Sequence, residues 1–308
     1  MDKILLVNKD KGYTSRDVVN ALSQVFHTNK IGHFGTLDPL ATGLLIIGIG
    51  KYTKVGNLLE KDDKQYVAEV LIGTSTDTYD VTGTVTKKED IKEIDRDLLV
   101  GVLERYKGLY LQEVPIYSAV KVKGKKLYEY ARNKESVTLP RKLVNIHSIE
   151  LIDIYERENN LYFSFKCSVS KGTYIRSLIN DMSKSIKIPM CMSNLKRTKQ
   201  DKFSIEDSYT IKDIRKGNYK LLDIEDIIDL NIIEVSDSLY DIVKNGGLIE
   251  KTGDKPILFR KDGKNIALYM DYDKNKNLMK PFIFYGGNWY GFWFTWRFKK
   301  ESWYSYNY

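Results

Sequence analysis

Runs and alternations of apolar residues predict where the strands of this chain lie. Unbroken apolar runs at 4–7 and 44–47 predict two short buried strands. The segment 64–70 is rich in β-forming residues and predicts a third. Over 161–169, apolar and polar residues alternate strictly, which predicts a strand with one buried face and places Cys167 in the core.

A second rhythm, with apolar residues every three to four positions, predicts amphipathic helices. It begins after Thr14-Ser15, either of which can cap a helix whose apolar residues span 18–26. The same rhythm predicts helices at 94–106 and 175–182, a short one at 53–60, and an acidic helical region at 211–233.

The pattern changes near residue 236, which predicts a domain boundary. We expect a first domain over 1–235 and a second over 236–288, built from short strands with turns at 245–247 and 261–263. The last segment, 289–308, contains all four tryptophans and is dominated by aromatic residues. We have no physical account of this aromatic tail.

One acid stands apart from these patterns because it lies among small and apolar residues. Pro39 disfavours the α-region at the preceding residue, so the carboxylate of Asp38 should project from an extended backbone. Glycines at 32, 35 and 43 permit unusual dihedral angles and close approach of another molecule. Asp-Pro flanked by glycines is equally typical of an ordinary turn. Local pattern alone therefore leaves both interpretations open.

Charge favours a polyanionic partner. The chain has 49 basic and 41 acidic residues, a formal net charge of +8 and a pI near 9.0. Basic residues interleaved with tyrosines are what a groove that follows an RNA backbone needs, and a cluster at 121–126 precedes Tyr128 and Tyr130. The alternative is an ordinary solvated face. We assign RNA-backbone contacts to this cluster: Lys121, Lys123, Lys125 and Lys126.

Cofactors and metals are not expected. The chain's two cysteines, Cys167 and Cys191, and its three histidines lack the spacing of a zinc site or a disulfide framework. No Walker-type loop is present, and the glycines at 48 and 50 lack the third glycine of a dinucleotide fingerprint. No apolar run approaches the ~18 residues of a membrane span and the N-terminus lacks a secretory pattern, so we expect a cytoplasmic protein.

Residues 32–43 read Gly-His-Phe-Gly-Thr-Leu-Asp-Pro-Leu-Ala-Thr-Gly, which closely resembles the catalytic motif of the bacterial TruB family of tRNA pseudouridine synthases. Other segments resemble the family in the same order: 9–15, 64–66, 73–83, 112–119, 167–176 and 194–198. Departures occur at Asp10 and Val114, where the family has proline, and at Lys196, where it has arginine. The resemblance covers about residues 3 to 210.

This resemblance implies an α+β fold with a mixed, largely antiparallel sheet and flanking helices, followed by a small β-rich PUA-like RNA-binding domain. It implies conversion of the T-loop uridine at position 55 of tRNA to pseudouridine after base flipping. Asp38 would be the catalyst and Arg176 its ion-pair partner. Tyr66 would stack on the base and help to remove the C5 proton, His33 would prop the displaced loop, and Leu195 would supply an apolar wall.

Two of these residues, Tyr66 and Arg176, could also have purely structural roles. A tyrosine in a strand usually packs into a half-buried surface, so Tyr66 needs no ligand. Arg176 lies in the first turn of a predicted helix, where the helix dipole disfavours a cation by up to ~1 kcal/mol. An acid elsewhere in the chain should therefore compensate for it, unless the side chain simply reaches solvent.

We expect tRNA as the partner, no required protein partner, no membrane, and a monomer. Three other functions remain to be weighed. A glycoside hydrolase also cleaves at an anomeric carbon, but it normally needs two placed carboxylates. A guide-RNA-dependent pseudouridine synthase shares the motifs but would need partner proteins. A tRNA-binding folding chaperone would use the same basic groove without essential catalysis.

Overall fold

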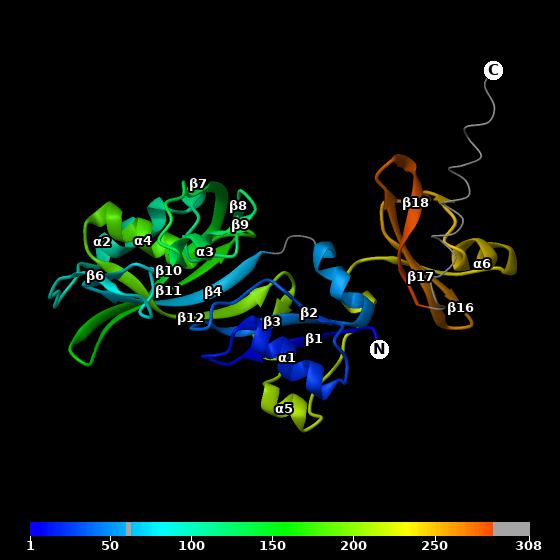
Figure 1. The fold of residues 1–308 in the computed structure, drawn as a ribbon, viewed down its shortest axis with the longest axis horizontal. Helices are drawn as coiled ribbons and strands as arrows, with labels where there is room; N and C mark the ends of the chain where they lie inside the picture. The colour runs from blue at the N-terminus through cyan, green and yellow to red at the C-terminus, as the bar shows by residue number, and fades with distance from the viewer. Residues whose placement is uncertain (60–62, 286–308) are drawn as a thin grey trace, which may run out of the picture. The chain divides into compact units, whose positions relative to one another are not determined.

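The computed structural model describes residues 1–59 and 63–285, and the chain divides into two compact units at residues 1–223 and 224–308 (Figure 1). Each unit has its own sheet and its own apolar core. No helix among the described residues is both long and apolar enough to cross a membrane.

A nine-stranded mixed sheet forms the first unit within its described residues. Its main order is β1-β3-β12-β4-β11-β10-β7, with β2 added to β3 and β13 to β12. Every pairing is antiparallel except β12 with β3. The strands are β1 (Lys3–Lys9), β2 (Ile31–Phe34), β3 (Thr42–Ile49), β4 (Lys64–Ile72), β7 (Gly108–Glu113), β10 (Arg141–Arg157), β11 (Asn160–Val169), β12 (Met190–Gln200) and β13 (Phe203–Ser204).

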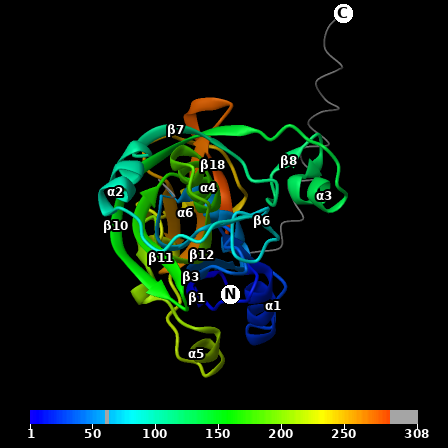
Figure 2. The same ribbon diagram turned by 90° about the vertical axis from the view of Figure 1, so that its left-hand side faces the viewer.

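Helices cover different parts of this sheet (Figures 1 and 2). Two apolar clusters lie between the helices and the sheet. Helices α2 and α4 pack on the half formed by β10, β11, β12 and β4, and α1 and α5 pack on β1, β2 and β3. Two small hairpins project from the sheet, β5 (Thr74–Thr76) with β6 (Val85–Lys88) and β8 (Lys121–Val122) with β9 (Lys125–Lys126). The helices are α1 (Ser15–Val25), η1 (Gly50–Leu58), α2 (Arg96–Arg105), α3 (Leu127–Arg132), α4 (Ile175–Ile186), η2 (Ile205–Asp207) and α5 (Ile211–Arg215).

The parallel pairing of β3 with β12 brings two distant segments into close contact. Gly43 pairs with Arg197 and has a φ of +100°. A Cβ at Gly43 would lie 2.3 Å from the carbonyl oxygen of Arg197, so only glycine fits there. This approach places the loop that carries Asp38, which ends where β3 begins, beside the C-terminal half of β12.

The expected fold class is confirmed, and most of the predicted elements are present. Two helix predictions in the first unit need correction. The short helix expected at 53–60 is the 3₁₀ segment Gly50–Leu58. Of the helical region expected at 211–233, only Ile211–Arg215 is an α-helix, because Lys216 ends it and Gly217 follows with φ +83°. A left-handed glycine at that position is a common way to terminate a helix.

The second unit contains a five-stranded sheet in the order β14-β16-β17-β18-β15, which confirms the expected small β-rich domain. Its first strand lies before the boundary expected at residue 236 yet pairs with β16. The predicted turn at 261–263 joins β16 to β17. The elements are η3 (Ile224–Asp226), β14 (Asn231–Glu234), α6 (Asp237–Lys244), β15 (Ile249–Glu250), β16 (Ile257–Lys261), β17 (Lys264–Tyr272) and β18 (Asn275–Phe284).

Helix α6 was not expected, because 237–244 was interpreted as part of a strand-rich region. Ser236 caps it by accepting a hydrogen bond from the backbone N–H of Leu239, which is a standard start signal for a helix. The aromatic tail expected at 289–308 lies outside the described residues.

Candidate active site

The loop between β2 and β3 carries Asp38 and is fastened to helix α1. The hydroxyl of Ser15 accepts a hydrogen bond from the N–H of Leu37 at 2.9 Å and donates to its carbonyl at 3.2 Å. The N–H of Ala41 donates to the carbonyl of Asp38 at 3.0 Å, which closes the turn. As expected from the proline at 39, Asp38 lies outside helix and strand. Its side chain is 37% exposed.

Buried cations hold this loop from beneath. Arg197 is fully buried and donates to the carbonyl of Leu44 at 2.7 Å and to that of Gly35 at 3.1 Å. Lys9 is also buried, and its Nζ donates to the carbonyl of Tyr13 at 2.6 Å and to that of Pro39, in the loop, at 3.5 Å. Burial lowers the pKa of Lys9 to about 8. Backbone carbonyl oxygens thus stabilise the buried charges of Arg197 and Lys9. The same hydrogen bonds fix the backbone segments that carry these carbonyls.

Arg176 meets Asp38 although the two are 138 positions apart. Its Nε donates to one carboxylate oxygen of Asp38 at 2.8 Å and its Nη2 to the other at 3.3 Å. The guanidinium also donates to the carbonyl of Thr78 at 3.0 Å and to that of Tyr117 at 3.1 Å. The Arg176 side chain is only 6% exposed, so its guanidinium is held in place by these partners, and the bidentate contact fixes the direction of the carboxylate.

A second acid, Asp80, stands behind this pair and belongs to the motif segment at 73–83. One of its carboxylate oxygens lies 3.8 Å from the Arg176 Nε, and the other accepts hydrogen bonds from the side chains of Thr78 and Thr82. Asp80 is buried, so the cation has two acidic neighbours. Its place in the motif at 73–83 was the only sign of this in the sequence.

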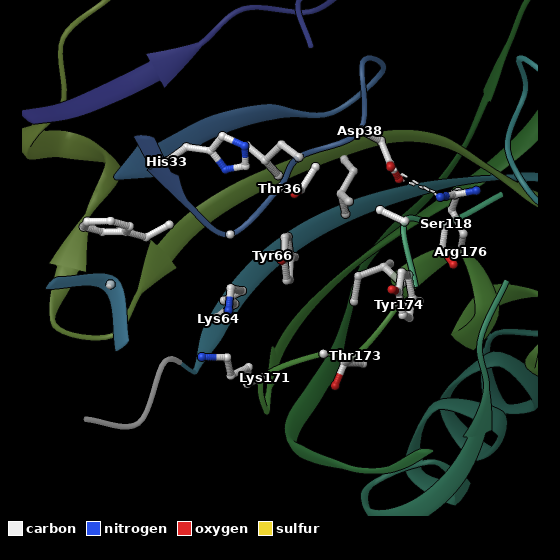
Figure 3. A pocket seen from close by; sticks show the side chains of 18 of the residues that line it. His33, Thr36, Asp38, Lys64, Tyr66, Ser118, Lys171, Thr173, Tyr174 and Arg176 are labelled. Atoms are coloured by element: carbon white, nitrogen blue, oxygen red, sulfur yellow. Dashed lines mark hydrogen bonds and ion pairs between the residues drawn. The ribbon is translucent and has the colours of Figure 1, made fainter. Parts of the chain in front are cut away.

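A pocket of about 530 Å³ lies in front of the Asp38–Arg176 pair (Figure 3). All five residues predicted to contact substrate or carry out the chemistry line it: His33, Asp38, Tyr66, Arg176 and Leu195. Asp38 and Arg176 lie at one end, Lys64 and Lys171 at the other, and Tyr66 lies between them (Figure 3). Asp80 is not a lining residue. Among the described residues, the pocket therefore presents a single carboxylate, that of Asp38.

Tyr66 occupies the centre of the pocket on strand β4. It is 6% exposed and contacts the Arg197 guanidinium. Burial raises the pKa of its hydroxyl, while the contact with Arg197 acts in the opposite direction. Arg197 thus links Tyr66 to the loop that carries Asp38, which sequence reasoning missed because only Leu195 was singled out in that segment.

His33 lies on strand β2 at the side of the pocket (Figure 3). Burial lowers its pKa, and the positive charges of Arg197 and Arg16 lower it further. Its Nδ1 atom is buried and has no hydrogen-bond partner among the described residues. The lowered pKa favours the neutral imidazole at this side of the pocket.

The predicted lysine cluster does not line the pocket but follows directly after it. Residues 117–119 line the pocket, and the N–H of Tyr128 in α3 donates to the carbonyl of Ser118 at 3.1 Å. The β8–β9 hairpin lies between these segments. Lys121 and Lys123 on this hairpin are exposed.

The other two lysines of the cluster already have partners within the hairpin region. Lys125 donates to both carboxylate oxygens of Glu135 at 2.7 Å and lies 4.8 Å from the ring centre of Tyr130. The Nζ of Lys126 lies 3.3 Å from the hydroxyl of Tyr128. The four lysines are therefore not equivalent as candidates for RNA contact.

This arrangement can support nucleophilic or acid–base chemistry by one carboxylate whose partner keeps it oriented. Two opposed carboxylates, which most glycoside hydrolases use, are not found together in this pocket. Among the described residues, no group of three or more His, Cys, Asp or Glu side chains is arranged to hold a metal ion.

Comparisons with known proteins agree on one family. Residues 23–175 match the family described as "TruB family pseudouridylate synthase (N terminal domain)". A tRNA pseudouridine synthase B of Caldanaerobacter subterraneus subsp. tengcongensis is 39% identical over 252 residues, which cover 82% of this chain and 87% of that protein. One of Bacillus pumilus is 35% identical over 295 residues, which cover 90% and 96%.

Solved structures give the same fold at lower identity. One titled "Crystal Structure of a Cbf5-Nop10-Gar1 Complex" matches with a TM-score of 0.63 and 21% identity, over 90% of this chain and 83% of that one. This likeness concerns the fold alone. The identity to the curated relatives extends over most of both sequences, and the chain belongs to the TruB family of pseudouridylate synthases.

Proposed function

We propose that this protein converts the T-loop uridine at position 55 of tRNA to pseudouridine. The observation that carries the proposal is the bidentate contact of Arg176 with Asp38, at 2.8 and 3.3 Å, at one end of a pocket that also contains Tyr66. The curated relatives bear the name tRNA pseudouridine synthase B, which supports tRNA as the substrate.

The reaction is an isomerisation, so it needs no redox partner. The N1–C1′ glycosidic bond breaks, the freed uracil turns, C5 bonds to C1′, and the C5 proton leaves while N1 gains one. Asp38 acts as the nucleophilic or covalent catalyst. Two routes remain open for it, attack on the sugar or deprotonation of it, and both need an ionised carboxylate aimed at the ribose. Arg176 supplies that orientation.

The target base cannot be reached while it is stacked in the RNA, so it must turn out into the pocket. Tyr66, which lines the pocket, is proposed to stack on the base, and its hydroxyl is proposed to assist removal of the C5 proton. Leu195 supplies an apolar wall. His33, at the side of the pocket, is proposed to prop the loop from which the base has been displaced.

We further propose that the second domain, at about residues 236–288, binds the tRNA away from Asp38, and that the protein acts as a monomer without a protein partner. A tRNA substrate would place this activity in the cytoplasm. The lysines of the β8–β9 hairpin would contact RNA phosphates next to the pocket.

Two of the alternative functions are weakened by specific observations. A hydrolase would need a second carboxylate in the pocket, and Asp80 is buried behind Arg176 instead. A chaperone without catalysis would not need a buried arginine to orient an acid at the end of a pocket, since such burial of charge is costly. Activity of the isolated chain on bare tRNA would exclude the third alternative, a guide-RNA-dependent pseudouridine synthase.

The deciding experiment maps pseudouridine by mass spectrometry in tRNA incubated with the purified chain alone. We expect one new pseudouridine, in the T-loop at position 55. A matched tRNA with cytidine at that position should gain none. Modification elsewhere in the tRNA would contradict the proposed position, and no modification at all would contradict the proposed activity.

A further inference from the structure

The side-chain amide of Gln112, on strand β7, makes hydrogen bonds to both backbone polar groups of one distant residue, Tyr174. Its Oε1 accepts a hydrogen bond from the N–H of Tyr174 at 2.8 Å, and its Nε2 donates to the carbonyl of Tyr174 at 3.0 Å. Nε2 also contacts the hydroxyl of Tyr110. Gln112 is 1% exposed. It therefore satisfies the backbone of Tyr174 as a neighbouring strand would.

Tyr174 is the residue from which helix α4 begins. It is the N-cap of the helix, yet its own side chain makes no capping hydrogen bond. The carbonyl of Tyr174 accepts the first helical hydrogen bond, from Leu178 at 3.0 Å. Arg176 is the second residue of the helix, so the position of Tyr174 determines where the Arg176 guanidinium lies.

The turn before Tyr174 is fastened to the same pair of strands. Lys142 on β10 is the cross-strand partner of Gln112, and its Nζ donates to the carbonyl of Lys171 at 3.0 Å. Gly172 follows with φ +84°, and a Cβ there would lie 2.0 Å from that Nζ. The N–H of Ser170 donates to a carbonyl of β10 at 2.9 Å. The turn is thus tied to β7 and β10 at three points.

We propose that Gln112 is a positioning residue that holds the start of α4 so that Arg176 can aim the Asp38 carboxylate. Gln112 does not line the pocket, so it acts through the helix start and does not touch the substrate. The proposal rests on the proposed pseudouridine synthase function. It means that a residue on β7, at the edge of the sheet, controls the orientation of the Asp38 carboxylate.

The physical reason is the sensitivity of catalysis to small displacements. Without the amide, the N–H of Tyr174 loses its partner, and the first turn of α4 is free to shift. A displacement of about 1 Å at a catalytic group costs on the order of 100-fold in rate. Arg176 contacts Asp38 at 2.8 and 3.3 Å, and such a shift would break at least one of these contacts.

Gln112→Glu tests this role because a carboxylate can accept from the N–H of Tyr174 but cannot donate to its carbonyl. We expect the turnover rate at saturating tRNA to fall about 10- to 100-fold, with little change in tRNA affinity. Gln24→Glu, the same change at an exposed position of α1, should leave both unchanged. Gln112→Met, which has a similar volume but no amide, should be slowed as much.

A pH profile separates positioning from general destabilisation. A protonated glutamic acid can donate and accept as glutamine does, and burial raises the pKa of a carboxyl group. The rate of Gln112→Glu relative to the parent should therefore recover as the pH is lowered from about 8 to about 6. Gln112→Met should not recover, and it corrects for effects of pH that arise elsewhere in the protein.

Several results would overturn the proposal. If both Gln112 variants are folded and turn over at the parental rate, Gln112 does not position Arg176. If only affinity falls, or if Gln112→Glu shows no recovery at low pH, the role is structural. Should Gln112→Glu fail to fold, the rate of Gln112→Met decides. A parent chain that leaves tRNA unmodified would instead refute the proposed function, and this inference with it.

Discussion

Two basic regions adjoin the pocket and differ in how their charges are used. At the pocket's end, Arg176 is buried, and Asp38 and two backbone carbonyls accept hydrogen bonds from it. On the β8–β9 hairpin, Lys121 and Lys123 project into solvent. Burial strengthens the electrostatic interactions of Arg176 and makes them depend on each of its partners. Water and salt screen the charges of Lys121 and Lys123.

This difference assigns different tasks to the two regions. A buried guanidinium in a bidentate contact fixes both the position and the orientation of the carboxylate that it holds. Exposed lysines attract phosphates over a longer range but specify no geometry. We therefore expect substitutions in the pocket to change the rate of the reaction and those in the hairpin to change RNA affinity and its salt dependence.

The largest effect is expected for Asp38→Asn, which preserves shape but removes the charge and the nucleophile. Pseudouridine formation in single-turnover assays should fall by on the order of 10⁴-fold or more, while tRNA affinity stays close to that of the parent. Filter binding under the same conditions is the control. An undiminished rate would mean that another acid is the catalyst or that the protein only binds tRNA.

Arg176→Lys should have the next largest effect even though the charge is retained. Lysine cannot make the planar two-point contact with the carboxylate of Asp38, nor reach the carbonyls of Thr78 and Tyr117 at the same time. Removal of one such preorganised contact costs on the order of 10²- to 10³-fold in rate.

The double variant provides the sharper test of this pair. Adding Arg176→Lys to Asp38→Asn should slow the residual reaction no further, since the two residues act as a unit. Additive losses in the same single-turnover assay would show that Arg176 acts independently of Asp38.

Tyr66 should give an intermediate effect that separates stacking from proton removal. Tyr66→Leu loses both roles, and the stacking part alone is worth ~1–3 kcal/mol. Tyr66→Phe keeps the ring and loses only the hydroxyl that contacts Arg197. Rates of both variants with saturating tRNA make the comparison, and parental activity of Tyr66→Phe would eliminate the proposed role of the hydroxyl.

The smallest effect on rate is expected in the hairpin, where a matched pair of variants is available. Replacing both Lys121 and Lys123 by alanine should weaken tRNA binding and reduce the salt slope by ~0.7–0.9 for each RNA phosphate that the protein no longer neutralises. Replacing both Lys125 and Lys126, whose ammonium groups already have partners in the protein, should reduce it less. Equal slopes for the two double variants would contradict the distinction drawn between them.

Much of the fold follows from local sequence. The alternation over 161–169 predicts β11, and the helical spacing over 18–26 and 175–182 predicts α1 and α4, because each pattern reflects which face of one element is buried. The motif around Asp38 marked the loop that lines the pocket. Local patterns failed where one glycine outweighed propensity, as at Gly217 after α5, and at α6, where a cap at Ser236 was overlooked.

Only the tertiary structure decided which distant groups meet. The position of Arg176 in a helix first turn predicted that it needs an acid, and the motif resemblance suggested Asp38, but neither singled out Asp80. The support from Arg197 and Gln112 depends on the parallel pairing of β3 with β12 and on the packing of α4 against β7. Hydrophobic periodicity shows which face of an element is buried, whereas hydrogen bonds between segments depend on sheet register and on close approaches such as that at Gly43.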